Sequence, residues 1–454
     1  GGEERADRPD QAEEDGATRT RHPPTLHRRD EEPRLCDDID YIEPDIEPDP
    51  SPTEAPGRTT VTAATHPFDP FSTGAVDEDP YPIYRRMRDE TPFYFDERWD
   101  LWVISRFEDV QNALKDWRTF SQEPDVDIDG FMQDLVSPDG NILVMDPPRH
   151  TQLRRMVQGT DIFSQRSIDA MEPEIRAIVD RLIDGFVERG SADFVQEFSY
   201  PLPLAVGPVL IGFPPEDLAM IDVWQRATQP RTPGVRGIPP EAFEAGAKIR
   251  AYIEALVEDR RRNPQADLVS KIAHAEIDGE RLGVEAVGLT FILFEASIDT
   301  TSGVLSSGLL ALQRNPDQRR KLVQDPSLIP NAVEEMLRYD MPVQFNARTL
   351  TRDVELHGVT APAGSRAIVL FGSANRDERE FPDADTFDVE RKIVRHLGFG
   401  QGIHQCIGAP LARLELKVAL EQLLQRIPEW EAAGPHVRIT KQNLRGLQHY
   451  PVSF

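Results

Sequence analysis

The stretch from Val287 to Leu312 constrains the fold of this chain most strongly, because it is apolar on nearly every side. A helix at a protein surface keeps a polar face, whereas a helix that is hydrophobic all round is buried. The apolar periodicity extends the predicted helix to Val284–Arg314. The sequence therefore predicts a long helix that runs through the middle of a large core.

The remainder of the chain from residue 66 onward is also patterned mainly for helices. We expect one large domain over residues 66–454 that is mainly α with small β-sheets. The other expected helices are Tyr81–Glu90, Arg106–Asp116, Ile168–Arg189, Pro240–Arg262, Asn331–Tyr339 and Ala409–Gln425. One small sheet is expected from Phe93–Phe95 with Trp102–Ile104, and another from Arg348–Leu350, Val354–Leu356 and Ile368–Leu370.

Residues 1–65 have a different composition from the predicted domain. Within the first 60 residues, 18 acidic residues stand against 8 basic ones, with 9 prolines and a single aromatic residue, Tyr41. Such a segment buries too little apolar surface to offset the entropy lost on ordering. The sequence predicts a disordered, acidic, proline-rich extension, either a solubilising tail or an arm for a basic partner.

Composition excludes several classes of protein. The 51 basic and 79 acidic residues give a formal net charge of −28, which argues against binding to nucleic acid or to an anionic membrane. No apolar run reaches the roughly 18 residues that a membrane helix needs, and no secretory signal pattern begins the chain. Two cysteines cannot form a disulfide scaffold. The cytoplasm is therefore the expected compartment.

The segment from Phe399 to Gly408 carries the strongest chemical signal. Its glycines at 400, 402 and 408 permit tight turns and a close approach of the backbone to a flat group. Cys406 stands just before an apolar helix, whose N-terminal partial charge stabilises a thiolate. A thiolate placed in this way suits iron as a soft axial ligand. A buried, reduced cysteine in a glycine-rich loop is the alternative if the motif is taken alone.

The spacing of this segment resembles the Phe-Gly-x-Gly-x-x-x-Cys-x-Gly motif of the cytochrome P450 family, the haem-thiolate monooxygenases. The resemblance extends from about Pro67 to the C-terminus. It implies the cytochrome P450 fold, with haem b between the long central helix and the helix that follows the cysteine loop. It also implies Cys406 as the iron ligand, with Phe399, Gly400 and Gly408 against the haem.

A pair of charged residues supports the resemblance. Glu335 and Arg338 are three residues apart on a predicted helix, so they share one face. In the family this pair locks with a later arginine, which Arg391 matches. An ordinary surface pair is the alternative, because the pattern also arises by chance. The resemblance gives these three residues a structural role.

The centre of the long helix holds polar residues from Ala296 to Thr301. Burying an acid and threonines in an apolar helix costs free energy unless they have a function or hydrogen-bond partners. A threonine hydroxyl can also donate a hydrogen bond to the carbonyl oxygen of the preceding turn. The resemblance places Ala296 against the haem and makes Asp299 and Thr300 the catalytic residues that deliver protons to bound dioxygen. The family usually has glycine where this chain has Ser297.

The propionates of haem need cationic or hydrogen-bonding partners in a mostly apolar cavity. His150 and Arg154 are one helical turn apart in Asp146–Arg154, which follows the family's Asp-Pro-Pro-x-His-x-x-x-Arg element. Arg348 and His404 complete the expected propionate set. Each of these residues alone could equally be a solvated surface charge.

The resemblance places Glu295 beside the substrate, where apolar residues are usual. Because Glu295 lies four residues before Asp299, both should share a helix face. We expect Glu295 to contact a polar or basic group of the substrate. The alternative is a glutamate that is held by a neighbouring arginine or tyrosine, or that is turned away from the pocket. The other expected substrate contacts are Ile292, Val343, Phe345 and Leu447.

Electrons must come from a partner, because the sequence contains neither a dinucleotide-binding fingerprint nor a cysteine cluster. Basic residues gather around the cysteine loop, and they would steer an acidic ferredoxin to this face. A normal mixed surface is the alternative. This basic set consists of Arg149, Arg155, Arg391, Lys392, Arg395, Arg413 and Lys417.

The resemblance as a whole implies a monooxygenase that uses dioxygen and electrons from a ferredoxin and its reductase. It would insert one oxygen atom into a small or medium organic substrate, by hydroxylation or oxidative dealkylation. A peroxygenase driven by hydrogen peroxide is one alternative, which the Asp299–Thr300 pair disfavours. A non-catalytic haem sensor or carrier with the same fold is the other.

Overall fold

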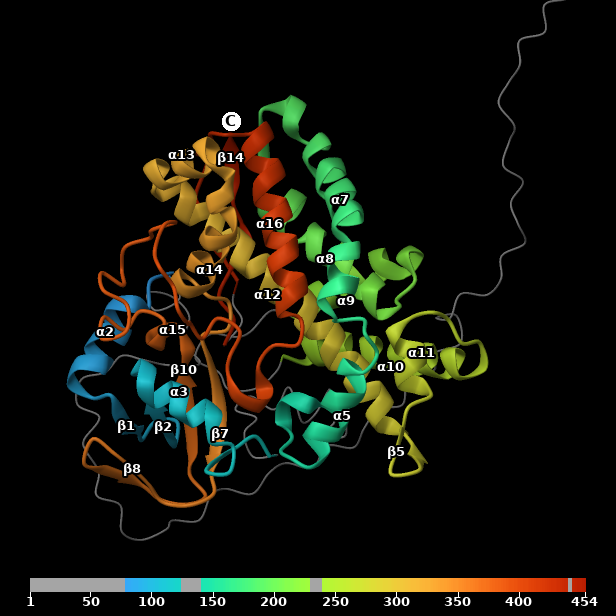
Figure 1. The fold of residues 1–454 in the computed structure, drawn as a ribbon, viewed down its shortest axis with the longest axis vertical. Helices are drawn as coiled ribbons and strands as arrows, with labels where there is room; N and C mark the ends of the chain where they lie inside the picture. The colour runs from blue at the N-terminus through green and yellow to red at the C-terminus, as the bar shows by residue number, and fades with distance from the viewer. Residues whose placement is uncertain (1–77, 124–139, 229–238, 440–442) are drawn as a thin grey trace, which may run out of the picture. The chain divides into compact units, whose positions relative to one another are not determined.

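A computed structural model describes residues 78–123, 140–228, 239–439 and 443–454, so the predicted extension over residues 1–65 lies outside the described residues (Figure 1). Helices dominate this part of the chain and the sheets are small, as the sequence predicted. The α-helices are α2 (Tyr81–Glu90), α3 (Phe107–Lys115), α5 (Arg149–Gln158), α6 (Gln165–Ala170), α7 (Glu172–Asp184), α8 (Pro201–Ile211), α9 (Leu218–Ala227), α10 (Pro240–Arg262), α11 (Leu268–Ala273), α12 (Val284–Arg314), α13 (Pro316–Gln324), α14 (Ile329–Tyr339), α15 (Phe371–Ala374) and α16 (Ala409–Arg426).

Helix α12 is the long buried helix that the apolar pattern predicts, with the same bounds. It packs against α8, α10, α14 and α16, which surround it (Figure 1). Every residue from 286 to 294 and from 301 to 312 is buried. Between these two runs, residues 295–297 and Thr300 keep accessible surface. The helix is therefore sealed by its neighbours except at its centre.

The two sheets expected from the sequence are joined in one five-stranded sheet of order β1-β2-β10-β7-β3. Strand β10 (Arg366–Leu370) runs parallel to β2 (Leu101–Ile104) and antiparallel to β7 (Phe345–Leu350). The expectation of a separate second sheet was wrong, because a local pattern predicts a strand but does not identify a partner far away in the sequence.

The other strands are short. Strand β8 (Val354–Leu356) was expected in that second sheet, but it pairs with β9 (Val359–Ala361) as a separate hairpin. The remaining strands are β1 (Phe93–Asp96), β3 (Phe120–Ser121), β4 (Ser191–Asp193), β5 (Glu276–Ile277), β6 (Glu280–Arg281), β11 (Glu431–Ala432), β12 (Val437–Arg438), β13 (Leu447–His449) and β14 (Pro451–Ser453).

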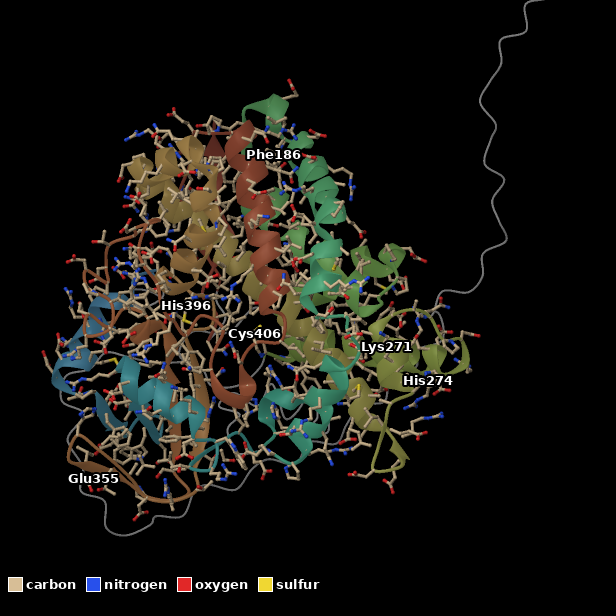
Figure 2. All side chains as sticks on the ribbon, viewed as in Figure 1. Phe186, Lys271, His274, Glu355, His396 and Cys406 are labelled. Atoms are coloured by element: carbon tan, nitrogen blue, oxygen red, sulfur yellow. The ribbon has the colours of Figure 1, made fainter. Side chains whose placement is uncertain are left out.

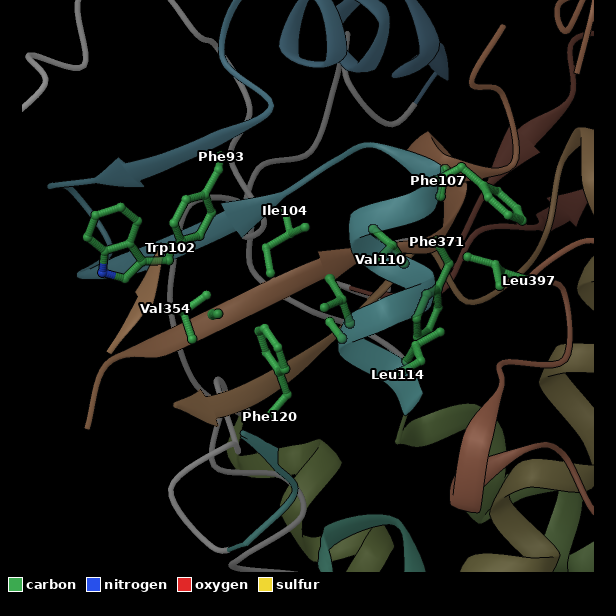
Figure 3. Packing of buried hydrophobic residues seen from close by; sticks show 14 of the residues in the cluster. Phe93, Trp102, Ile104, Phe107, Val110, Leu114, Phe120, Val354, Phe371 and Leu397 are labelled. Carbon is green, nitrogen blue, oxygen red and sulfur yellow. The ribbon is translucent and has the colours of Figure 1, made fainter. Parts of the chain in front are cut away.

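The five-stranded sheet packs against α3 through one hydrophobic cluster (Figure 3). Phe93 and Trp102 stack on the sheet with ring centroids 4.8 Å apart. Val110 and Leu114 of α3 are buried in the same cluster. Helix α3 is therefore fixed on the sheet, and its C-terminal end lies where the cysteine loop passes.

The helix expected over Ile168–Arg189 is divided into several pieces. Helix α6 ends at Ala170 and α7 begins at Glu172, with Pro173 in its first turn. Proline has no N–H to donate to the preceding turn, so it starts a new helix at this point. After α7 ends at Asp184, a short 3-10 turn over Val187–Arg189 leads to Gly190, whose φ is +66°.

A buried ion pair joins Glu335 and Arg338 on α14. Both side chains are 0% exposed, and the guanidinium makes contacts of 2.7 and 2.8 Å with the two carboxylate oxygens. Arg338 also donates to the carbonyl oxygens of Asn375 and Ala384, each at 2.9 Å. The pair therefore connects α14 to the chain segment that follows α15.

Arg391 adds a third charged group to this ion pair. Its Nε lies 3.3 Å from Oε1 of Glu335, and its other nitrogens donate to the carbonyl oxygens of Pro382, Asp383 and Thr386. The residues that lead from α15 to the cysteine loop are thus held to α14 by hydrogen bonds to buried charges.

We predict that Glu335→Gln lowers the free energy of unfolding by about 3–5 kcal/mol, because it leaves the Arg338 charge buried without a counter-charge. Urea denaturation of the purified holoprotein measures this loss. The matched control is Glu380→Gln, whose partner Arg395 is half exposed at 2.7 Å and whose loss should cost less than about 1 kcal/mol. Equal losses in the two variants would contradict the prediction.

Candidate functional site

The cysteine loop is built by backbone conformations that require glycine. Gly400 and Gly402 have φ values of +64° and +73°, in the left-handed region. A Cβ atom at Gly402 would lie 2.3 Å from the carbonyl oxygen of Leu114 at the end of α3. The N–H of Cys406 donates to the carbonyl oxygen of Phe399 at 2.9 Å and closes the loop. The loop is therefore held between α3 and the start of α16.

Cys406 lies just before α16 (Figure 2), and its side chain is exposed. Burial by the surrounding protein nevertheless raises the pKa of the thiol, while the backbone N–H groups of Gly408 and Ala409 and the charge of Arg154 act in the opposite direction. A sulfur that is accessible, yet partly desolvated and approached by N–H donors, is suited to hold a metal as the thiolate.

The centre of α12 offers a second accessible surface. Ala296 is exposed and Thr300 is partly exposed, one turn apart on the same face. The Thr300 hydroxyl donates to the carbonyl oxygen of Ala296 at 2.8 Å, as the sequence analysis anticipated for a threonine in this helix. Asp299, beside them, is 7% exposed.

Ser297 occupies the position where the family usually has glycine, and the neighbouring helix accommodates it. Its hydroxyl donates to the carbonyl oxygen of Phe294 at 2.7 Å. A Cβ atom added to Gly207 of α8 would lie 2.6 Å from the Ser297 Oγ. The serine fits because residue 207 has no side chain, and its hydroxyl is satisfied within its own helix.

The four residues expected to bind propionates lie in one electropositive region. His150 and His404 have ring centroids 4.3 Å apart. Within the described part of the chain, none of their ring nitrogens has a hydrogen-bond partner of standard geometry. Arg348 is 3% exposed and donates to the carbonyl oxygen of Ala347, and Arg154 donates to that of Gln405.

Burial and mutual repulsion both act on this group. Burial lowers the pKa of His150 to about 4, with a further contribution from Arg154. Burial lowers the pKa of His404 to about 2, and His150, Arg348 and Arg154 lower it further. Burial also lowers the pKa of Arg348 to about 10. The carboxylate of Asp146 acts in the opposite direction on His150 and Arg348, but its oxygens accept hydrogen bonds from Ser121 and Gln122. Donors and cations gathered in this way fit a dianionic ligand, which is what the two propionates of haem provide.

Glu295 and Asp299 lie on one face of α12, and both approach Gln225 of α9. The Gln225 Nε2 is 3.4 Å from Oε2 of Glu295 and 3.5 Å from Oδ2 of Asp299. Gln225 belongs to no motif that the sequence shows. The only signal was its spacing, because Ile221, Gln225 and Thr228 recur at the interval of a buried helix face and all three are buried.

The other expected substrate residues lie in different surroundings. Ile292 is buried on α12, one turn before Ala296. Phe345 belongs to a hydrophobic cluster with Tyr84 of α2, and Val343 pairs with Leu444 in an isolated β-bridge. The N–H of Leu447 donates to the Ser306 hydroxyl at 3.3 Å, well along α12 from Glu295.

Most of the basic set is neutralised by neighbouring carboxylates. The structure pairs five of its members with acids: Arg149 with Glu285, Arg391 with Glu335, Arg395 with Glu380, Arg413 with Glu334, and Lys417 with Glu172. Within the described residues, Arg155 and Lys392 form no ion pair and are exposed. The positive charge available near the cysteine loop is therefore smaller than the sequence suggested.

A network of hydrogen-bonded charged residues, which no sequence motif indicates, supports the cysteine loop. Glu334 of α14 accepts hydrogen bonds from Arg413 at 2.6 Å and from His396 at 2.8 Å, and these contacts lower the pKa of Glu334 to about 2 despite its burial. The Arg413 guanidinium also lies 4.5 Å from the ring centroid of Phe399. Phe399 is thus packed against α16 at the start of the motif.

Within its described residues, the chain has no helix that is both long enough and apolar enough to pass through a bilayer.

Comparison with known proteins gives one consistent result. Residues 238–428 match the family model described as Cytochrome P450. Putative cytochrome P450 123 of Mycobacterium tuberculosis is 37% identical over 83% of this chain and 94% of the relative. The monooxygenase PikC of Streptomyces venezuelae is 35% identical over 82% of this chain and 91% of PikC.

Solved structures agree with these relatives. The structure of PksS, a cytochrome P450 of the Bacillus subtilis bacillaene polyketide synthase, superposes with a TM-score of 0.76 at 33% identity and covers 85% of this chain and 99% of PksS. The thiol before α16, the electropositive region and the open centre of α12 are what a haem-thiolate site needs. The chain belongs to the cytochrome P450 family and is a monooxygenase that binds haem b.

Proposed function

We propose that this enzyme accepts electrons from a separate ferredoxin and inserts one oxygen atom into a small or medium organic substrate. Hydroxylation or oxidative dealkylation is the proposed outcome, and the cytoplasm is the proposed compartment. The observation that carries the proposal is the Cys406 thiol, held just before α16 with the N–H groups of Gly408 and Ala409 directed at it. Bound haem supplies the iron that activates dioxygen.

The chain's own residues would hold the cofactor. Cys406 would bind the iron, and His150, Arg154, Arg348 and His404 would bind the propionates. For the two histidines this assignment is supported by their ring nitrogens, which have no hydrogen-bond partner within the described residues. The remaining proposed haem contacts are Ala296, Phe399, Gly400 and Gly408.

Asp299 and Thr300 would hold protons at the centre of α12 and pass them toward the dioxygen substrate. Asp299 is buried beside the exposed surface of Ala296, and the Thr300 hydroxyl is fixed by its bond to the preceding turn. A fixed hydroxyl and a buried carboxyl can pass protons in turn while bulk water is excluded. This is the role that we propose for the pair.

Glu295 would contact a polar or basic group of the substrate. It is half-buried at the open centre of α12, and its carboxylate is steadied by Gln225. Ile292, Val343, Phe345 and Leu447 would provide apolar contacts. One relative, PksS, is named for polyketide biosynthesis, which is compatible with an organic substrate of medium size.

The ferredoxin would bind beside the cysteine loop, where Arg155 and Lys392 are exposed. Because most other members of the basic set are already paired with acids, electrostatic steering would come from few charges. Part of the contact would therefore be apolar, and Val394, which is 97% exposed two residues after Lys392, is suited to it.

We predict that Cys406→Ala abolishes both the haem-thiolate spectrum of the reduced carbon monoxide complex and NADH oxidation with a surrogate ferredoxin and its reductase, since the substitution removes the iron ligand. Absorption spectroscopy and the NADH assay measure the two losses. The matched control is Cys36→Ala, the other cysteine of the chain, which should keep both. Unchanged Soret features in Cys406→Ala would contradict the proposal, and turnover with hydrogen peroxide alone would indicate a peroxygenase.

We predict that Arg348→Leu speeds the loss of haem by about 10- to 100-fold, because a hydrogen bond to a charged group contributes about 1.5–3 kcal/mol. The rate of haem transfer to an excess of apomyoglobin measures this effect. Arg352→Leu is the matched control, since Arg352 is 71% exposed and 3.5 Å from Asp116. Equal rates for the two variants would rule out a propionate contact by Arg348.

We predict that Glu295→Leu weakens the binding of amine-containing ligands by about tenfold or more, and that of neutral ligands much less, because it removes the partner of a charged donor. Ligand-induced spectral shifts of the ferric enzyme give the dissociation constants. Glu285→Leu is the control on the same helix, since Glu285 pairs with Arg149 at 2.6 Å instead. Unchanged amine affinity in Glu295→Leu would refute this contact.

A further inference from the structure

Gln225 of α9 is completely buried, and its side chain bridges two carboxylates of α12. Its Nε2 lies 3.4 Å from Oε2 of Glu295 and 3.5 Å from Oδ2 of Asp299. The amide nitrogen can only donate, and a carboxyl group has an accepting oxygen whether or not it is protonated, so the nitrogen end of the amide is the end that faces both acids. One amide group therefore holds two acids that are one helical turn apart.

The other end of the same amide has no comparable contact. Within the described part of the chain, the Gln225 Oε1 is buried and lacks a hydrogen-bond partner. A glutamine retained only for packing would be expected to have both ends satisfied, because a buried unpaired oxygen costs free energy. The carboxylates of α12 are thus the contacts that orient this side chain.

The residues around Gln225 fix its place on α9. The neighbouring Arg226 donates to Asp222 at 2.8 Å and to Oε1 of Gln196 at 2.8 Å, and its guanidinium lies 4.0 Å from the ring centroid of Tyr200. Gln196 in turn donates to the carbonyl oxygen of Gln448 at 2.6 Å. The C-terminal end of α9 is therefore anchored, and the amide of Gln225 is presented to α12 from a fixed position.

We propose that Gln225 is a positioning residue for proton delivery. It holds the carboxyl groups of Glu295 and Asp299 together. After Asp299 has passed its proton on through Thr300, the protonated Glu295 gives its proton to the Asp299 carboxylate, and Glu295 then takes a replacement proton from water. Glu295 is half-buried whereas Asp299 is 7% exposed, so the proton moves from the more accessible acid to the less accessible one. The inference rests on the proposed role of Asp299 and Thr300.

Two substitutions at Gln225 distinguish the effect of its hydrogen-bond donor from the effect of its side-chain volume. Gln225→Met has nearly the same shape without a donor, and Gln225→Lys keeps a donor on a side chain of similar length. We expect Gln225→Met to lower NADH oxidation with the surrogate ferredoxin by about tenfold or more, with a larger solvent isotope effect in deuterium oxide. The rate of NADH oxidation by Gln225→Lys should stay within about threefold of the rate of the unaltered enzyme. The matched control is Gln422→Met, a buried glutamine on α16, which should change neither quantity.

A second measurement needs no turnover. Urea denaturation of the ferric holoenzyme is compared for Gln225→Met, Asp299→Asn and the double variant. Residues in contact give non-additive effects, whereas distant residues give additive ones. We expect non-additivity for Gln225 with Asp299 and additivity for Gln422 with Asp299. Additive effects in the first cycle would overturn the proposed contact.

The outcomes distinguish this inference from the proposed function. If Asp299→Asn leaves the NADH oxidation rate and its isotope effect unchanged, then the proton relay itself is wrong. If Asp299→Asn lowers the rate and Gln225→Met does not, the relay stands and the role of Gln225 is overturned. Equal losses in Gln225→Met and Gln225→Lys would also overturn that role, because the donor would not be the property that matters.

Discussion

The buried pair of Glu335 and Arg338 is the interaction on which the arrangement of the site depends. A charge taken out of water is tolerated only when it is paired and hydrogen-bonded, and here both groups are fully covered. Their remaining donors and acceptors are used by backbone groups between Asn375 and Asp388 and by Arg391. The path of the chain into the cysteine loop is therefore set by where these charges find partners.

Local features of the sequence predicted much of this molecule. The bounds of α12 follow from its uniform hydrophobicity, and the cysteine loop follows from glycines whose positive φ values no other residue type adopts readily. The sheet was harder to predict, because β2 and β10 are separated by most of the chain. The break at Pro173 was also missed, because the apolar periodicity continues across it.

The charges around the site were also hard to predict, because they depend on contacts between residues far apart in the sequence. Counting basic residues near Cys406 in the sequence suggested a positive surface, but the carboxylates that neutralise it come from α7, α12 and α14 and are visible only in three dimensions. Gln225 was missed for a related reason, since its significance comes from two acids on another helix. Residues identified by a motif could be predicted from the sequence, whereas residues identified only by their partners could not.

The close approach of Gly207 to Ser297 makes the two positions evolutionarily interdependent. A methyl group at 207 would meet the serine side chain at less than a normal contact distance, so a change there is tolerated only after residue 297 has become smaller. A chain with glycine at 297 would leave room for a Cβ atom at 207, whereas this chain does not. The order in which substitutions are introduced at the two positions therefore decides which combinations can be reached through folded intermediates.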